Sequence, residues 1–404
     1  MSSRLSRFEA GFPIALGAAF LLWAAPAPAH GQEDRIPDPA PVLDGPHDPF
    51  NLGFAKTAYT VGLKLEEVFD DNVFLAADDQ ESDSITMATF TARVRHDYGS
   101  GAAHLNYLGR QRHYARFSEL DGDEHLVDGA AGLDVSNFKF EAGFEWRELK
   151  DPVDVLQSTD RFDSQYDREY LKATGDFGRF DVELRGALSR FTADHEFHDR
   201  GDYRRSEASA TGLVEAWSQV ALLGEIGYRQ TLYDEDHFSD FTIVSVFAGA
   251  RGSLTPKTRT EVKVGYARAE PAGDSVVEAD EFTGFVGSLT TAWTMTEKQE
   301  FRIELRREPV ESYVTGLELM NGALVGYKFT PTERLTAESS LGWEERRETD
   351  GGRRSGLRAG VGAQWTFAEK IVADVGAVFR TRYDSDPASE FENLRISIGI
   401  GVNW

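Results

Sequence analysis

The sequence predicts an all-β protein: a single transmembrane up-and-down antiparallel β-barrel. Three observations support this prediction. Apolar and polar residues alternate with a period of two from about Thr57 onward, as in strands whose two faces meet different surroundings. The predicted strands are joined alternately by short turns and by long polar loops. The last strand alternates along its whole length and ends on an aromatic residue, Trp404.

The composition alone would fit a soluble acidic protein. The chain has 404 residues, a formal net charge of -25 and no cysteine. In a membrane barrel, lipid-facing and lumen-facing residues alternate and therefore cancel in an average over the sequence. The acidic balance argues against nucleic acid as a partner, because its recognition needs clustered lysine and arginine. The absence of cysteine excludes disulfides and thiolate metal sites and is compatible with an oxidising periplasm.

The N-terminal part predicts export from the cytoplasm. Residues 1–29 resemble a cleaved secretory signal peptide, with arginines near the start, an apolar run from Phe12 to Ala25 and a small-x-small site at Ala27-Pro28-Ala29. The run is too short for a membrane helix, which needs roughly 20 apolar residues. Residues 30–56 are rich in proline, aspartate and glycine and predict an extended periplasmic tether. We assign residues 57–404 to the barrel.

The strand pattern is clearest between Phe138 and Arg147. Phe138, Phe140, Ala142, Phe144 and Trp146 share one face, and Lys139, Glu141, Gly143, Glu145 and Arg147 share the other. A soluble sandwich also alternates in this way. The pattern of connections favours the barrel, because short turns on one side and long loops on the other are typical of outer-membrane barrels.

The connections also predict the number of strands. Short turns fall, for example, at Ser136-Asn137 and Thr330–Glu333, and long loops at Asp70–Asp83 and Glu148–Asp167. This alternation gives about 18 strands, an even number that places both termini of the chain in the periplasm. The pattern is ambiguous around 241–250 and 283–293, so about 16 strands is the alternative.

Aromatic residues gather at the positions expected for interfacial girdles. Those near the predicted short turns are Phe138, Phe180, Phe301, Phe329, Phe367 and Trp404, and those near the long loops are Tyr114, Trp146, Phe191, Tyr233, Trp343 and Phe379.

The final strand carries a predicted assembly signal. Its apolar face includes Ile396, Ile398, Ile400, Val402 and Trp404. This pattern resembles the C-terminal signal of outer-membrane barrels, which the barrel assembly machinery recognises and which closes the barrel against the first strand. Phenylalanine is the commoner last residue in that pattern. In a soluble domain, the same strand would expose a long hydrophobic edge to aggregation.

The predicted inner face carries charges of both signs. The candidate lumen-lining residues are Arg93, Arg95, Arg110, Arg112, Arg147, Arg185, Glu141, Glu145, Arg380 and Arg382. One interpretation is a hydrated channel whose wall carries rows of arginines, with Arg93, Arg95, Arg110 and Arg112 close together on neighbouring strands. The other is that oppositely charged pairs brace a wide barrel.

No pattern in the sequence predicts a catalytic or metal site. Acidic runs such as Asp121–Glu124 could hold divalent cations that bridge to lipopolysaccharide phosphates, but a solvated loop explains them better. His195 and His198 are spaced as metal ligands can be, without an evident third ligand. The sequence shows no set of nucleophile, histidine and acid. Gly399-x-Gly401 lies within a strand and indicates packing instead of phosphate binding. We therefore expect no cofactor, no metal and no enzymatic activity.

The first predicted strand and loop carry a more specific resemblance. Residues Val61–Phe74, and Asp71-Asn72-Val73-Phe74 above all, resemble the start of the barrel in a second proteobacterial family of outer-membrane β-barrel porins, often associated with exopolysaccharide loci. The resemblance implies an outer-membrane barrel, most simply a pore for small solutes, without identifying a solute. The partners expected are outer-membrane lipid, lipopolysaccharide and the barrel assembly machinery, with polysaccharide-export components as a further class. The oligomeric state stays open.

Two other functions compete with the pore. A plugged barrel could bind surface polymers or other cells through its acidic loops, and a conductance measurement would separate it from a pore. An outer-membrane barrel enzyme is the more distant alternative, because the sequence does not assemble a nucleophile with a base.

Overall fold

The computed structural model describes residues 57–98, 100–150, 163–194, 202–217, 219–234, 240–272, 281–312, 316–348, 352–385 and 387–404. The expected signal peptide and tether lie outside these residues and stay predictions. The strands are β1 (Thr57–Asp70), β2 (Asp83–Asp97), β3 (Gly101–Tyr114), β4 (Gly122–Val135), β5 (Phe138–Leu149), β6 (Asp163–Asp176), β7 (Phe180–Asp194), β8 (Tyr203–Trp217), β9 (Val220–Tyr233), β10 (Asp240–Thr255), β11 (Thr258–Ala272), β12 (Phe282–Thr296), β13 (Gln299–Ser312), β14 (Gly316–Thr332), β15 (Leu335–Glu348), β16 (Arg353–Ala368), β17 (Ile371–Asp384) and β18 (Phe391–Asn403).

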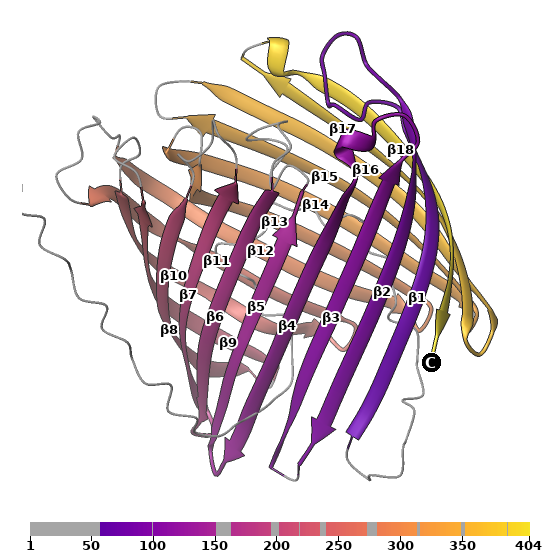
Figure 1. The fold of residues 1–404 in the computed structure, drawn as a ribbon. Coiled ribbons are helices and arrows are strands. Elements are labelled where there is room, and N and C mark those ends of the chain that lie inside the picture. Colours follow the sequence, from indigo (N-terminus) through magenta and orange to yellow (C-terminus); the bar gives the residue numbers. More distant parts are fainter. Residues whose placement is uncertain are drawn as a thin grey trace, which may run out of the picture.

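The described strands form one closed antiparallel barrel (Figure 1). Each strand pairs with its neighbours in the sequence, and β1 pairs with β18 to close an 18-stranded sheet. The predicted fold class and the larger strand count are therefore confirmed. The two stretches of ambiguous pattern are single strands, β10 and β12.

The connections differ between the two ends of the barrel, which we call the short-turn end and the long-loop end. At the short-turn end, β4 and β5 are joined by residues 136–137 alone, with Ser136 at a φ of 54°. Such a left-handed conformation is typical of two-residue hairpins. At the long-loop end, residues 71–82 join β1 to β2. The barrel begins with β1 and finishes with β18 at the short-turn end (Figure 1).

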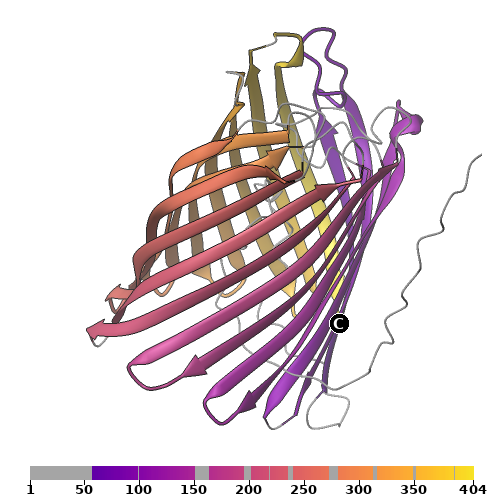
Figure 2. The same ribbon diagram turned by 90° about the vertical axis from the view of Figure 1, so that its left-hand side faces the viewer.

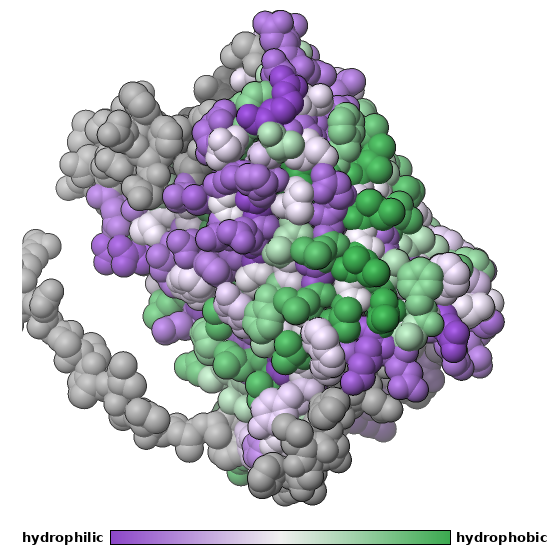
Figure 3. Space-filling model, turned by 45° about the vertical axis from the view of Figure 1, so that its right-hand side comes forward, coloured by the Kyte–Doolittle hydropathy of each residue, from purple (hydrophilic) through white to green (hydrophobic). Residues whose placement is uncertain are grey.

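The outer face of the barrel is apolar. Leu63, Leu171, Ile226 and Ile398 are examples of its large exposed side chains. Figure 3 shows such residues gathered across the middle of the wall, with hydrophilic residues toward the long-loop end. The described part of the chain contains no helix with the length and apolarity needed to cross a membrane.

The expectation for the aromatic residues is partly wrong. Trp404, Phe138 and Trp343 are exposed on the outer face, where an interfacial girdle would lie. Tyr114, Phe191 and Tyr233, by contrast, are buried within the barrel. The registers place all three on the inner face, because one step along a strand exchanges the two faces. Position near a loop therefore does not suffice to predict a girdle residue.

The last strand closes the barrel as the sequence predicted. Its register with β1 runs from Gly62 opposite Asn403 to Asp70 opposite Arg395. The backbones of Val61 and Trp404 exchange two hydrogen bonds, of 3.0 and 2.8 Å between nitrogen and oxygen. The recognition of this strand by assembly machinery remains a proposal.

The Asn72 side chain ties the first loop to the last strand at the long-loop end. Its amide nitrogen donates to the carbonyl oxygens of Ala76 and Glu392, both at 2.9 Å. Its amide oxygen accepts from the backbone nitrogen of Ala76, also at 2.9 Å. The side chain is fully buried, so these bonds replace those it would make with water.

Two aspartates extend this connection, which we call the seam latch (residues 70–72 with 392–395). Asp70 accepts hydrogen bonds from the side chains of Asn393, at 2.5 Å, and Arg395, at 2.7 Å. Asp71 accepts from the backbone nitrogen of Leu394 at 2.7 Å. The Asp-Asn segment on which the family resemblance depends thus holds the two end strands of the barrel together.

Gly399 has a packing role at the same seam. Lys64 of β1 reaches across it to Asp374 of β17, with 2.8 Å between the ammonium and the carboxylate. A Cβ on Gly399 would lie 2.5 Å from Cε of Lys64. Glycine therefore leaves room for this ion pair to cross β18, and a side chain at this position would force Lys64 to shift.

Candidate functional site: the inner wall of the barrel

The inner wall is identified by ion pairs that pass over intervening strands. Arg251 of β10 contacts Glu183 of β7 at 2.6 Å, and Lys263 of β11 contacts Glu225 of β9 at 3.2 Å. Only the concave side of a curved sheet brings such strands close enough for side chains to meet. The strand registers place all the predicted lumen residues on this face.

Toward the short-turn end, this wall carries a network of shared charges. Glu183 also contacts Arg185 at 3.1 Å, and Arg251 also pairs with Glu261. Glu261 in turn contacts Lys263 at 3.3 Å. Each carboxylate is shared between two cations, so that the wall is polar but nearly neutral here.

Arg93 and Arg95 are exposed to the interior. The Arg93 guanidinium donates to Asn106 on β3 at 2.8 Å. Arg95 pairs with Asp97 on its own strand at 3.0 Å, and its side chain is 51% exposed. An ion pair this exposed contributes little to the free energy of unfolding. Both guanidinium groups are accessible from the lumen.

Arg110 and Arg112 have a different environment. Both contact Glu124 on β4, Arg110 at 3.2 Å. Arg112 is only 8% exposed, so the expectation that it faces water is wrong. Arg110 lies opposite Thr89 and not beside Arg93, which separates the two arginine pairs by about four residues, or roughly 13 Å along the strand. They do not form one continuous row.

The other predicted lumen residues also have nearby charges. Arg147 pairs with Glu145 on β5, and Glu141 lies opposite Lys172 in the register of β5 with β6. The side chains of Glu141, Glu145 and Arg147 are partly buried. On β17, Arg380 lies opposite Arg358 of β16, and buried Arg382 pairs with Asp384 at 2.6 Å.

The acidic run at Asp121–Glu124 is divided between two environments. Asp121 lies in the loop before β4 and accepts hydrogen bonds from the Tyr114 backbone at 2.7 Å and from His113 at 2.6 Å. The Tyr114 bond, supported by His113, lowers the pKa of Asp121 below its usual value. Glu124 instead belongs to the inner wall. The run is therefore not one loop cluster.

Exposure on the inner face differs between the two ends. Exposed charged side chains lie toward the short-turn end and include Arg93, Arg95, Asp97 and Arg302. Buried ones lie toward the long-loop end and include Arg112, Arg205, Arg346, Arg354 and Arg382. The interior is therefore more open to solvent at the short-turn end and more densely filled at the long-loop end.

One hairpin end separates from its neighbour β12, although its second strand stays paired with β15 as far as Glu318 and Glu348. The ladder between β12 and β13 stops at Gly287 and Arg307, whereas β13 continues to pair with β14 as far as Ser312 and Gly316. We call residues 308–312 and 316–320 the inward arm. Figure 2 shows the ends of these two strands, in orange, curving away from the wall over the interior.

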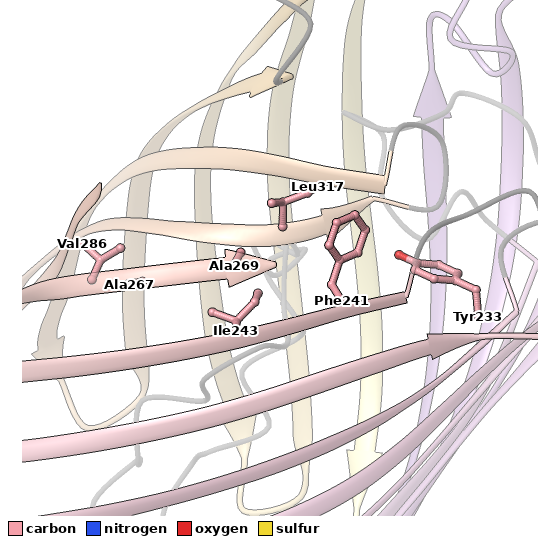
Figure 4. Close-up of a cluster of buried hydrophobic side chains, with 7 residues drawn as sticks. All are labelled: Tyr233, Phe241, Ile243, Ala267, Ala269, Val286 and Leu317. Atoms are coloured by element: carbon pink, nitrogen blue, oxygen red, sulfur yellow. The ribbon is translucent and has the colours of Figure 1, made fainter. Parts of the chain in front are cut away.

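The inward arm contacts the wall formed by β9, β10 and β11. Leu317 belongs to a buried apolar cluster with Phe241, Ala269 and Tyr233, completed by Ile243, Ala267 and Val286 (Figure 4). Arg229 of β9 donates to the carbonyl oxygen of Pro309 at 3.4 Å. These contacts place the arm over the inner face of β9, β10 and β11, strands that are not its sheet neighbours.

The base of the arm is held by buried charges. Glu318 contacts Arg346 of β15 at 3.6 Å and also pairs with Arg354 of β16. Arg346 contacts Glu344 on its own strand at 2.7 Å. The side chains of Glu318 and Arg346 are both 0% exposed, and a buried charge without such partners would be costly.

Pro309 explains why the wall ladder stops here. If β12 and β13 stayed in register, Phe285 would face Pro309, which has no N–H to donate. The carbonyl oxygen of Phe285 instead accepts from the Arg307 side chain at 3.1 Å, and Arg307 also donates to Asn321 at 2.6 Å. The arm was not predicted from the sequence, although Pro309 was a usable indication, because proline interrupts the ladder of a central strand.

The described residues contain no group of three or more histidine, aspartate or glutamate side chains placed to hold a metal ion. His195 and His198 lie outside the described residues.

Comparison with known proteins places the whole barrel in one family. The model of the family described as "Putative beta-barrel porin 2" matches residues 59–403. No curated protein sequence matches the chain significantly.

Several solved structures resemble the fold. Pseudomonas aeruginosa OccK2 (OpdF) has a TM-score of 0.48 and 13% identity, with 86% of this chain and 98% of that chain covered. The P. aeruginosa outer membrane protein opdK has a TM-score of 0.47 and 12% identity, with 86% and 99% covered. The FrpB iron transporter of Neisseria meningitidis has a TM-score of 0.45 and 10% identity, with 85% and 81% covered.

Proposed function

The chain belongs to this family of β-barrel porins, and on that premise we propose that it is a narrow, water-filled channel for small hydrophilic solutes. It is a porin-like protein of the Gram-negative outer membrane, and its family is one of porins and not of enzymes. The proposal adds the width of the path and the class of solute.

The observation that carries the proposal is the shared pairing of charges on the inner face. The Glu183–Arg251–Glu261–Lys263 network makes the wall polar while leaving it little net charge. A polar wall replaces part of a solute's hydration, and a nearly neutral one admits solutes of either sign. Denser filling toward the long-loop end favours a narrow path on the outer side and a wider one on the periplasmic side.

Planar bilayers and liposomes test this function. Purified, folded protein should produce discrete conductance steps, and liposomes containing it should swell in small sugars at rates that fall steeply with sugar size. Heat-denatured protein is the matched control. Folded protein that neither conducts nor admits sugars would refute the channel and favour the plugged barrel that binds through its loops.

We predict that the exposed arginines influence ion selectivity. Changing Arg93 and Arg95 to glutamine should move the reversal potential in a salt gradient toward cation preference, because two positive charges leave the lumen. The shift should shrink at high salt, since the Debye length is ~10 Å at 0.1 M and shorter above it. Changing Arg110 and Arg112 should also favour cations, but it leaves Glu124 without these partners and should lower stability.

Arg190 and Arg204 provide the control for this prediction. They lie opposite each other on the outer face of β7 and β8, so their change to glutamine removes equal charge from outside the lumen. If the reversal potential stays the same when Arg93 and Arg95 are changed, or shifts equally when Arg190 and Arg204 are changed, Arg93 and Arg95 do not border the path.

The association with exopolysaccharide export rests on the first-strand resemblance alone and stays a prediction. Deletion of the gene should then reduce the amount of polymer at the cell surface. Lipopolysaccharide and the barrel assembly machinery remain expected partners on the same terms.

A further inference from the structure

We propose that the inward arm, residues 308–312 and 316–320, is the constriction of the channel and sets the size limit for solutes. This inference rests on the proposed channel function. It assigns that size limit to one hairpin end, and not to the loops at the rim or to the full circumference of the barrel.

The position of the arm supports this assignment. Its tip packs through Leu317 onto Phe241 and Ala269 of β10 and β11 (Figure 4), while its base is joined through Glu318 to β15 and β16. The arm therefore projects over the inner face of the barrel between β10 and β16 and takes up part of the cross-section of the lumen there. Any solute must pass on the side that the arm leaves open.

The contacts of the arm also make it a fixed element. Arg229 donates to Pro309 and is itself held by Glu207 at 3.2 Å, which contacts Arg168 at 3.3 Å. This chain of charges joins the arm to β6, β8 and β9. A hairpin anchored by an apolar cluster on one side and buried ion pairs on the other is expected to hold one position while solutes pass.

The local sequence favours the inward position over a place in the wall. Pro309 has no N–H to donate to β12. The carbonyl oxygen of Phe285, which would face Pro309, accepts a hydrogen bond from the Arg307 side chain instead. Rejoining the wall would leave this step of the ladder incomplete. The arm is thus built into the fold and does not depend on a bound ligand.

Cross-linking tests the position independently of conductance. The chain has no cysteine, so pairs can be introduced without background. Leu317→Cys with Ala269→Cys should react with a short bifunctional thiol reagent in folded protein in membranes. Phe282→Cys with Ser312→Cys would face each other only if the β12–β13 ladder continued. Efficient reaction of this second pair, and none of the first, would overturn the proposal.

Single-channel conductance tests whether the arm is the constriction. Replacing residues 311–317 by Gly-Asn-Gly removes the tip, including Leu317, while keeping Glu318 and its buried partners. The single-channel conductance should rise about two-fold or more, because the narrowest section dominates the resistance. Larger sugars should then enter liposomes. The control places the same turn between Glu348 and Arg353, in a hairpin whose strands stay paired up to Arg347 and Arg353.

The outcomes separate the two proposals. Wild-type conductance that is unchanged by removal of the tip, or raised equally by the control, would refute the constriction and leave the channel standing. If the wild type does not conduct but the variant without the tip does, the proposed function is refuted and the arm closes the barrel. If neither the wild type nor the variant without the tip conducts although both fold, the channel and the constriction are both refuted.

Discussion

Changing Ile398 and Ile400 to aspartate will abolish insertion of the protein into the outer membrane. Both side chains lie on the outer face of β18 and are 65% and 54% exposed, where lipid surrounds them. A carboxylate in the bilayer costs on the order of 2–3 kcal/mol, and the two changes also interrupt the apolar face on which the proposed assembly signal depends. Membrane fractions should contain no heat-modifiable protein, and deletion of Trp404 should have the same effect.

Ser397→Asp is the matched control for the closing strand. Ser397 neighbours Ile398 but belongs to the inner face, opposite Gly376 and Val68. An aspartate there meets the lumen and not the lipid, so Ser397→Asp should assemble while Ile398→Asp is strongly impaired. Equal assembly of these two variants would refute both the assignment of faces and the proposed signal.

Changing Asn72 to aspartate will open the seam of the barrel at its long-loop end. The Asn72 amide donates to the carbonyl oxygens of Ala76 and Glu392, and a carboxylate would place an acceptor against both. Each unsatisfied buried group costs about 1–3 kcal/mol, so the free energy of unfolding should fall by roughly 2–5 kcal/mol. The measurement is urea unfolding of the refolded barrel in detergent, followed by its electrophoretic mobility.

Asp78→Ala provides the comparison for the seam latch. Asp78 is exposed in the same loop, so its removal should leave stability unchanged within about 0.5 kcal/mol. An Asn72→Asp variant as stable as Asp78→Ala would show that the latch contributes nothing to closure. Asp70→Ala should behave like Asn72→Asp, because it removes the acceptor for Asn393 and Arg395.

The strands and their faces were predictable from the sequence. Phe138 to Arg147 alternates in sequence and forms β5 with Phe138 outward and Lys139 inward. The pairing of β18 with β1 followed from the apolar face that ends on Trp404. The girdle prediction failed at Tyr114, Phe191 and Tyr233, where nearness to a loop was given more weight than the face of the strand.

The inner wall was predictable in its residue types but not in its contacts. Arg112 was expected to face water, yet it is buried against Glu124. Arg93 and Arg110 were expected side by side, yet the register separates them. Alternation shows which face a residue occupies, whereas its neighbours depend on how far adjacent strands slide past one another.

The sequence by itself determined the barrel, because alternation with a period of two is a local property that each strand carries alone. The tertiary structure decided which charges share a partner, how the seam latch joins residues 70–72 to 392–395, and where the inward arm leaves the wall. Those features bring together residues that are far apart in the chain. Their geometry depends on the curvature and register of the closed sheet, which no single strand encodes.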